Sequence, residues 1–315
     1  MFAHSLARLQ KLNQQTTNSF EKHGNFPCFF IYFDFMGFSF CFFISFCYNK
    51  KMKKNLNRVV VITGASSGLG LATYKHFEEN GDIPVCLSLT NSPNLENFFE
   101  CDVSSEDSVK KAFSDVFEKF GRIDILINNA GIATSGALEF EEKSQIDKEF
   151  AVNAIGPMLC YQSALKYMQK GAKIFNISSI CASCPVAFRG YYGGSKSALT
   201  NMGLTAYMEL KQSGVSVCTL NLGQTRTPLE KHRQNNTKTN WRYEKRIEGN
   251  LKNLQKDQSK RMSAESVAKK LYNLSTKKHP KPFIVVGFKF KMAYALYKIL
   301  PMKWFLDISN KFLGF

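Results

Sequence analysis

Several signals that mark common protein classes are missing from this sequence of 315 residues. Its nine cysteines are odd in number and irregularly spaced, which argues against a disulfide framework and favours reduced thiols in a reducing compartment. No nucleic-acid-binding motif accompanies the formal net charge of +17, so this charge favours phosphate cofactors or anionic membrane surfaces, and no nucleic-acid partner is expected. No internal repeat or low-complexity linker interrupts residues 58–287, which predicts one domain there.

The longest apolar run precedes that domain. Residues 26–48 read FPCFFIYFDFMGFSFCFFISFCY, which is long enough to cross a bilayer, and the basic segment NKKMKK follows. Asp34 inside the run and the lack of leucine and valine make insertion marginal. Two interpretations stay open. Residues 1–51 are either a signal anchor with the remaining chain in the cytosol, or a non-native leader before a true start at Met52, which would leave a soluble cytoplasmic protein.

From residue 58 onward, short β-rich runs alternate with helical patterns. This alternation predicts an α/β fold with a doubly wound parallel sheet. We expect helices over residues 69–80 and from a capping box at Ser104 and Asp107 to Gly121. The seven expected strands are residues 58–63, 84–89, 98–103, 123–128, 172–178, 215–220 and 282–286.

Two later segments depart from this alternation. Residues 228–261 are polar and basic, and they could form a mobile flap over a site or a solvated helical excursion. From residue 288 the chain mixes large apolar side chains with five lysines, so the basic amphipathic tail at 291–315 could lie on a membrane surface. Packing on the domain at 52–290, or on a partner subunit, is the alternative for this tail.

A glycine-rich segment, TGASSGLG, occupies residues 63–70 between an apolar run and an amphipathic helix. A strand that leads directly into a helix leaves unpaired backbone N–H groups at the helix start, and glycines let a pyrophosphate approach them closely. Gly64, Gly68 and Gly70 fit that requirement. Such a turn closes many strands and is weak evidence alone, so its position between strand and helix carries the inference.

Tyr192 and Lys196 stand four residues apart in YGGSK, and Ser179 lies thirteen residues before the tyrosine. A tyrosine with a pKa of about 10 needs a neighbouring cation to act as an acid or base near neutrality, and Lys196 on the same helix face meets that need. Ser179 follows a strand, where ligands collect in open α/β sheets, and would donate a hydrogen bond to a substrate oxygen. Tyr191 loses the shared face with the lysine.

These segments together resemble the short-chain dehydrogenase/reductase family, in its single-domain branch with TGxxxGxG and YxxxK motifs. The resemblance covers residues 57–290 and rests on the order and spacing of TGASSGLG, Cys101-Asp102-Val103, Asn128-Asn129-Ala130-Gly131, Asn153, Ser179, Tyr192 and Lys196. It implies a Rossmann-like fold of three layers with a seven-stranded sheet, an NAD(P)-dependent enzyme acting on CH–OH groups, and no metal. A homo-oligomer is also implied, with the helices that bear Asn153 and Tyr192 at its interface.

The resemblance also implies the roles of individual residues. Tyr192 would exchange the proton, Lys196 would support it and reach the nicotinamide ribose, Ser179 would hold the substrate, and Asn153 would hold a water. Asn128 would help to steady the central strand. The cofactor-binding residues that it implies are Thr63, Gly64, Ser66, Ser67, Gly68, Leu69, Gly70, Thr90, Asp102, Val103, Asn129, Ala130, Gly131, Tyr192, Lys196, Gly223, Thr225 and Thr227.

The chain departs from the family pattern in three places. Leu222-Gly223 stands where the family has Pro-Gly, and residues 90–97 leave little room for a helix between the second and third strands. The second strand ends in Ser88-Leu89-Thr90 without the carboxylate that would bind an adenosine 2′-hydroxyl, which favours NADP over NAD although no arginine is present there. The pair Cys181 and Cys184 has a redox or zinc spacing, but we expect it to line the substrate pocket.

The expected function is that of an NADP-preferring oxidoreductase. It would interconvert an alcohol with its ketone or aldehyde, on an apolar substrate of lipid-, retinoid- or steroid-like character. An NAD(P)-binding sensor or scaffold with little turnover is the alternative, because a fold alone does not establish activity. A sugar-nucleotide epimerase would need a larger C-terminal domain than the chain after Leu222 provides.

Overall fold

The structure is a computed structural model that describes residues 29–35, 38–44, 57–91, 93–226, 234–244, 246–247 and 261–312. The chain divides into two compact units, Met1–Lys54 and Asn55–Phe315. In the first unit, strands β1 (Phe29–Phe35) and β2 (Phe38–Ile44) pair in antiparallel fashion. Within the described ranges, no helix is both long enough and apolar enough to cross a membrane. The choice between an anchor and a leader stays a prediction.

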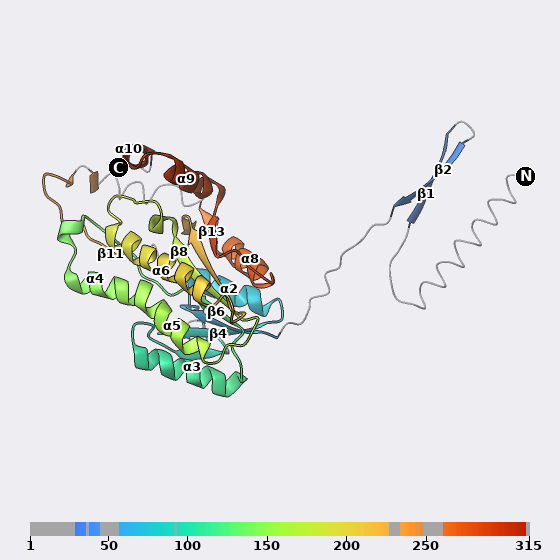
Figure 1. Cartoon of the computed structure of the whole chain (residues 1–315), viewed down its shortest axis with the longest axis horizontal. Coiled ribbons are helices and arrows are strands. Elements are labelled where there is room, and N and C mark those ends of the chain that lie inside the picture. Colours follow the sequence, from blue (N-terminus) through green and yellow to red (C-terminus); the bar gives the residue numbers. More distant parts are fainter. Residues whose placement is uncertain are drawn as a thin grey trace, which may run out of the picture. The chain divides into compact units, whose positions relative to one another are not determined.

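The second unit contains a parallel sheet of seven strands in the order β13-β9-β8-β6-β3-β4-β5 (Figure 1). The chain starts in the middle at β3, moves outward through β4 and β5, and then returns to add β6, β8, β9 and β13 on the other side. The strand order therefore reverses between β3 and β6, where ligands bind in such sheets. The strands are β3 (Val59–Thr63), β4 (Ile83–Ser88), β5 (Phe98–Glu100), β6 (Ile125–Asn128), β8 (Lys173–Ser179), β9 (Ser216–Leu222) and β13 (Phe283–Val286).

Helices cover both faces of this sheet. On one face, α3 (Glu106–Phe120), α5 (Gly156–Leu165) and α6 (Gly190–Glu209) pack against side chains such as Val59 and Val61. On the other face, α2 (Gly68–Glu78) and α8 (Ala264–Ser275) pack against Val60 and Ile62. Successive strand residues thus enter opposite cores, which explains the continuous apolar run at 59–62. The predicted three-layer doubly wound fold is confirmed.

The remaining elements are short or lie outside these layers. A two-residue strand β7 (Thr134–Ser135) pairs with β11 (Gln234–Asn235), and β10 (Thr225–Arg226) pairs with β12 (Met262–Ser263). Short 3₁₀ helices occupy Leu138–Phe140 and Ile180–Ala182. Helix α4 (Lys143–Phe150) continues through a π-helical turn at Ala151–Ile155 into α5. After β13 the chain forms α9 (Phe288–Ile299) and α10 (Met302–Phe312).

Two local predictions need correction. The cap of α3 is Ser105, whose side chain accepts a hydrogen bond from the Ser108 N–H at 3.3 Å, and not Ser104. The Ser104 hydroxyl instead donates to Asp102 Oδ1 at 2.6 Å. The same turn shortens the third strand, which ends at Glu100 and not at residue 103. As expected, the described residues between β4 and β5 contain no helix.

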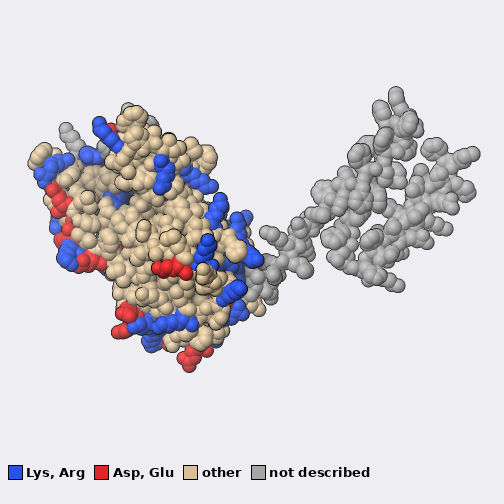
Figure 2. Space-filling model, in the orientation of Figure 1, with Lys and Arg blue, Asp and Glu red and all other residues tan. Residues whose placement is uncertain are grey.

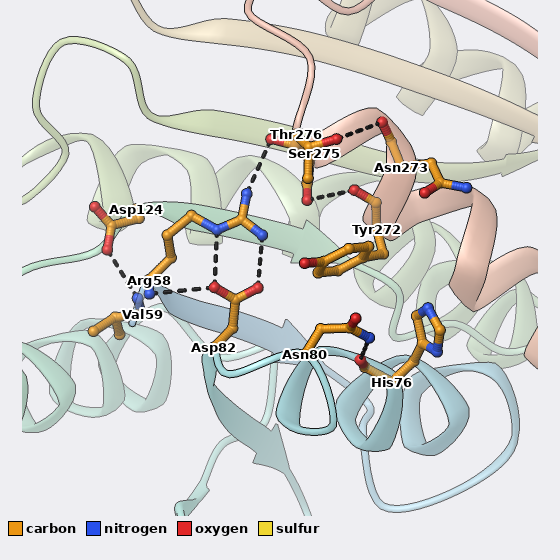
Figure 3. A network of polar contacts seen from close by, with 10 residues as sticks. All are labelled: Arg58, Val59, His76, Asn80, Asp82, Asp124, Tyr272, Asn273, Ser275 and Thr276. Atoms are coloured by element: carbon orange, nitrogen blue, oxygen red, sulfur yellow. Dashed lines mark hydrogen bonds and ion pairs between the residues drawn. The ribbon is translucent and has the colours of Figure 1, made fainter. Parts of the chain in front are cut away.

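A polar clamp joins the amino ends of the strands (Figure 3). Arg58 forms a two-pronged ion pair with Asp82, with Nε to Oδ1 at 2.9 Å and Nη2 to Oδ2 at 2.6 Å. Its Nη1 donates to the Ser275 carbonyl of α8 at 3.0 Å, and its guanidinium lies 5.7 Å from the ring centre of Tyr272. Next to it, Asp124 accepts from the Val59 N–H at 2.8 Å. The clamp thus joins β3, β4 and α8 at the amino ends of the strands, whereas ligands bind at the carboxyl ends.

The predicted flap at residues 228–261 lies largely outside the described residues. Of its described part, β11 runs beside β7, and Lys238 and Arg242 form ion pairs with Glu142 and Glu139 at 3.0 and 2.8 Å. These contacts connect the segment to the chain just before α4. Whether it opens and closes over a site stays a prediction.

Candidate active site

The glycine-rich turn between β3 and α2 has a backbone conformation that residues with side chains could not adopt without strain or a steric clash. Gly64 and Gly68 have φ angles of 67° and 56°, in the left-handed region that glycine adopts readily. A Cβ atom at Gly70 would lie only 2.2 Å from the Gly64 carbonyl oxygen. Ser67, at the N-cap of α2, makes no side-chain capping bond, so this helix start fits an anionic ligand such as a pyrophosphate.

Asn129, at the end of β6, holds this turn in place. Its Nδ2 donates to the carbonyl oxygens of Thr63 and Gly64 at 2.9 and 3.2 Å. The Thr63 hydroxyl in turn accepts from the backbone N–H groups of Asn129 and Ala130, both at 3.0 Å. One strand further, Asn128 Nδ2 donates to Asn176 Oδ1 at 2.9 Å and so links β6 to β8. These bonds fix the central strands around the turn.

Lys196 lies at the centre of the second part of the site. Its side chain is only 5% exposed, and Nζ donates to the Ile177 carbonyl of β8 at 3.1 Å. Burial lowers the pKa of Lys196 to about 8, and the negative charge of Glu149 opposes this shift. A Cβ atom at Gly131 would lie 3.3 Å from Nζ, so the absence of a side chain at Gly131 leaves the ammonium group accessible from the cofactor side of the sheet edge.

Hydroxyl groups fix α6 against β8 and therefore fix Lys196 and Tyr192. Ser178 donates to the Lys196 carbonyl at 3.1 Å, and Ser197 donates to the Ala182 carbonyl at 2.7 Å. Tyr192 is half-buried one helical turn before the lysine. The alternative tyrosine, Tyr191, donates its hydroxyl hydrogen to the Leu138 carbonyl at 3.2 Å, so this hydroxyl already has a hydrogen-bond partner. The geometry favours Tyr192 as the partner of Lys196.

Ser179 is the last residue of β8 and is buried. Its Oγ accepts a hydrogen bond from the Cys181 N–H at 3.2 Å, which leaves its hydroxyl hydrogen to be donated to a ligand. Ser178, the residue before Ser179 on β8, donates to the Lys196 carbonyl and so joins this strand to the helix that bears Tyr192 and Lys196. Three of the four predicted catalytic residues thus lie on two adjoining elements, β8 and α6, and their catalytic roles stay a prediction.

The fourth, Asn153, lies in the π-helical turn and is fully buried. Its Oδ1 accepts from the Ile132 N–H at 3.0 Å, while its Nδ2 donates to the Ile132 carbonyl at 2.9 Å and to Ser195 Oγ at 3.1 Å. The side chain therefore joins the loop after Gly131 to α6. A water held at Asn153 stays a proposal, since both side-chain donors serve these two contacts.

Sequence reasoning missed Glu149, one turn before Asn153. This carboxylate is fully buried, and it accepts hydrogen bonds from the Thr134 N–H at 3.0 Å and the Thr134 hydroxyl at 2.6 Å. Burial raises the pKa of Glu149, whereas the hydrogen bonds from Thr134 and the charge of Lys196 lower it. Its spacing of four residues from Asn153 was the available signal, because such a pair shares a helix face.

Most other predicted cofactor residues also follow the carboxyl ends of strands. Ser66 and Ser88 share a hydrogen bond of 2.9 Å between the glycine-rich turn and β4, and Thr90 is exposed just beyond. Asp102 Oδ1 accepts from the Ser104 backbone and hydroxyl, and Val103 is buried. Gly223 and Thr225 follow β9, and Thr227 lies outside the described residues. The remaining members of the set belong to the turn and the α2 start: Ser67, Gly68, Leu69 and Gly70.

The cysteine pair after Ser179 shows no sign of an activated thiol at Cys184. Cys181 is half-buried and Cys184 is buried, and burial raises the pKa of Cys184 to about 11. A thiol with so high a pKa is a poor nucleophile near neutrality. In the part of the chain that the structure describes, no group of three or more His, Cys, Asp and Glu side chains could hold a metal ion.

Comparisons with known proteins agree with this geometry. The family model for short chain dehydrogenases matches residues 58–238. A probable short-chain type dehydrogenase/reductase of Helicobacter pylori, VdlC, is 30% identical over 258 residues, covering 78% of this chain and 94% of its own. A 3-ketodihydrosphingosine reductase of Bacteroides thetaiotaomicron is 32% identical over 180 residues, covering 56% of this chain and 67% of its own.

Among solved structures, a short chain dehydrogenase/reductase from Burkholderia phymatum in complex with NAD has a similar fold. The TM-score is 0.66 and the identity 21%, over 76% of this chain and 92% of that one. At this identity the likeness concerns the fold alone.

Proposed function

Because the chain belongs to the short-chain dehydrogenase/reductase family, it is an NAD(P)-dependent oxidoreductase that interconverts CH–OH and carbonyl groups, and we propose that it prefers NADP and an apolar substrate. The observation that carries the proposed mechanism is the assembly of Ser179, Tyr192 and Lys196, held together by the bonds between β8 and α6. The glycine-rich turn and the open position at Gly131 fit a dinucleotide beside them.

In the proposed mechanism, bound cofactor supplies hydride to a carbonyl carbon or accepts it from an alcohol. Ser179 donates a hydrogen bond to the substrate oxygen and orients it toward Tyr192. The tyrosine gives its proton to that oxygen during reduction and takes it back during oxidation. The ammonium group of Lys196, held on the Ile177 carbonyl, stabilises the resulting phenolate.

The NADP preference rests on the end of β4. Ser88 stands where a carboxylate would bind the adenosine 2′-hydroxyl, and its hydroxyl bonds to Ser66 of the glycine-rich turn. Without a negative charge at this point, a 2′-phosphate meets no repulsion. The net charge of +17 of the whole chain acts in the same direction.

The apolar substrate rests on two further observations. A relative that is 32% identical is named for reduction of 3-ketodihydrosphingosine, a ketone with a long alkyl chain. Large exposed apolar side chains also follow β13 in α9 and α10. Association with a membrane, through residues 26–48 or the C-terminal tail, belongs to the same proposal.

A homo-oligomer is also proposed. Ile155, in the π-helical turn that bears Asn153, and Met208, on the helix that bears Tyr192, are both exposed apolar side chains. Exposed apolar groups on these two elements support an interface there. Sedimentation of the purified full chain would measure its mass in solution.

The central experiment replaces Tyr192 by phenylalanine and Tyr191 by phenylalanine as the matched control. We expect Tyr192→Phe to lower kcat for carbonyl reduction by about 10²–10⁴, the usual contribution of a positioned acid, and to affect NADPH binding far less than kcat. Tyr191→Phe should retain activity. Normal turnover by Tyr192→Phe would show that the mechanism is wrong. Binding of NADPH by the unmodified chain without turnover on long-chain, retinoid or steroid ketones would favour a sensor or scaffold.

A further inference from the structure

Helix α9 has two apolar faces, and only one of them packs on the domain. Phe290, Tyr294 and Tyr297 lie on the inner side. The ring centre of Tyr294 lies 5.3 Å from that of Phe283 in β13, with the rings tilted, and the ring centre of Tyr297 lies 5.2 Å from that of Phe305 in α10. On the opposite side, spaced by three and four residues, stand large apolar side chains with high exposure: Phe288 at 80%, Met292 at 51%, Leu296 at 42% and Ile299 at 78%.

Helix α10 extends this apolar surface. Its exposed side chains include Met302, Trp304, Leu306 and Ile308, so eight of the fourteen large apolar side chains that are exposed in the described residues come from 288–308. In Figure 2 the upper end of the domain, which α9 and α10 cover in Figure 1, is mostly uncharged with separate basic groups. We call this the α9–α10 surface.

The charges around the surface have one dominant sign. On a helix of 3.6 residues per turn, Lys289 falls on one side of the apolar stripe of α9, and Lys291 and Lys298 fall on the other. Lys303 adds a fourth cation, whereas Asp307 is the single acidic residue between 288 and 312. Lysines on both flanks of an apolar stripe can reach outward to headgroups while the stripe enters the interface.

We propose that the α9–α10 surface docks on a membrane that contains anionic lipids. A second copy of the chain fits less well, because two such faces packed together would bring the flanking lysines of each copy against those of the other. A lipid surface buries the same apolar side chains and offers negative charge to the lysines.

Helix α9, whose outer face belongs to the docking surface, lies with its inner face beside the carboxyl ends of the strands. Phe290 of α9 rests on Gly223, since a Cβ atom there would lie 1.9 Å from the Phe290 ring. Gly223 follows Leu222, which stands opposite Ser179 in the pairing of β9 with β8. An apolar substrate could therefore pass from the lipid to the site by a short path. The docking and this consequence both rest on the proposed function, but the docking is tested below without turnover.

The chain offers a built-in reporter for the test, because it has only two tryptophans, Trp241 and Trp304. In the full chain with Trp241→Phe, Trp304 is the sole tryptophan and is 62% exposed on α10. Vesicles of phosphatidylcholine and phosphatidylserine with brominated acyl chains should shift its emission to the blue and quench it. Phosphatidylcholine alone should do so weakly, and added salt should reverse the effect.

Variants then assign the effect to the surface. The pair Met292→Asp and Ile299→Asp should abolish the quenching of Trp304, whereas Met208→Asp, an exposed site on α6, should not. Lys289→Gln with Lys298→Gln should lower the affinity for anionic vesicles about 30-fold, from about 1 kcal/mol per lysine. NADPH binding by every variant would report an intact fold, and the quenching does not depend on turnover.

Three results would overturn the proposal. The first is Trp304 that stays unquenched on anionic vesicles, and the second is quenching that survives Met292→Asp and Ile299→Asp. The third is a dimer, seen by sedimentation without lipid, that these two substitutions dissociate, which would identify a second copy as the occupant.

Discussion

Lys196 keeps an ammonium group in a place that disfavours charge. Burial lowers its pKa to about 8, so between pH 8 and its ordinary value of 10.5 the folded chain holds fewer protons at this site than the unfolded chain. At pH values below 8, the buried charged lysine therefore lowers the free energy of unfolding. As the pH rises from 8 to 10.5 this penalty disappears, because the lysine then loses its proton in the unfolded chain as well. Glu149 is the negative charge that limits the shift, and it makes Lys196 a cation over more of the neutral range.

Glu149→Gln tests this link. The substitution removes the negative charge that raises the pKa of Lys196, so that pKa falls below about 8. Because the proposed mechanism needs the cationic lysine for reduction, the decline of kcat/KM at alkaline pH should move to lower pH. The pH profile of carbonyl reduction measures the shift. Glu139→Gln, which removes an exposed carboxylate paired with Arg242, should leave the profile unchanged. An unchanged profile for Glu149→Gln would mean that Glu149 does not tune the lysine.

Ser88→Asp tests the proposed cofactor preference. A carboxylate at the end of β4 would accept hydrogen bonds from the ribose hydroxyls of NADH and repel the phosphate of NADPH. One charged hydrogen bond contributes about 1.5–3 kcal/mol, so the ratio of kcat/KM for NADH over NADPH should rise about 10- to 100-fold. Ser88→Asn, which has nearly the same shape without the charge, should change the ratio far less. A preference of the unmodified chain for NADH would already contradict the proposal.

Helix α3 allows a test of its corrected N-cap, which is Ser105 and not Ser104. Ser105 accepts from the Ser108 N–H, so Ser105→Ala should lower the free energy of unfolding by about 1 kcal/mol, the usual effect of losing an N-cap. Ser104→Ala removes only the bond to Asp102 on the outside of the turn and should have a smaller effect. Urea denaturation of both variants would measure the difference. A larger loss for Ser104→Ala would restore the original prediction.

The elements, and the placement of the candidate catalytic residues on them, could be predicted because their signals are local. Tyr192 and Lys196 lie one turn apart on one helix, and Val59–Thr63 is a continuous apolar run that leads directly into glycines. The choice between Ser104 and Ser105 is decided within one turn, by which hydroxyl bonds to Asp102 and which accepts from the Ser108 N–H. Sequence patterns do not contain that information.

Long-range contacts were also beyond sequence reasoning. Glu149 looks like an exposed residue of an ordinary polar helix until the fold buries it against Thr134. The contact between Gly223 and Phe290 joins positions 67 residues apart, and the bond between Arg58 and Ser275 joins positions 217 residues apart. Such contacts follow from the way the sheet and its helices pack and not from the spacing of residues along the chain.

Across the whole domain, stability and chemistry occupy opposite edges of the sheet. The site lies where the strands end, and the clamp of Arg58, Asp82 and Ser275 lies where they begin (Figure 3). The Asp82 side chain is fully buried, so its removal would leave the guanidinium of Arg58 without its main countercharge. The fold can therefore be weakened without a direct effect on the site.

Asp82→Ala should lower the free energy of unfolding by about 3–5 kcal/mol, as expected for a broken buried ion pair. In a domain of this size, each kcal/mol of lost stability lowers the melting temperature by about 2–4 °C, so the melting temperature should fall by roughly 6–20 °C. KM for the cofactor should stay unchanged at temperatures where the variant is folded. Asp115→Ala, which breaks the exposed pair with Lys111, is the control and should cost less than about 1 kcal/mol. Equal losses for the two variants would contradict a special role for the clamp.

The order of the strands also has a consequence for biosynthesis. Among the described strands, β13 alone pairs with the outer edge of β9, and it follows β9 in the chain after residues 223–282. A ribosome adding roughly 5–20 residues per second needs about 3–12 s to make those sixty residues, and until then this edge of the nascent sheet has no strand to pair with. A message truncated within this interval would encode a product with a permanently open edge, which makes it a substrate for aggregation or for chaperones.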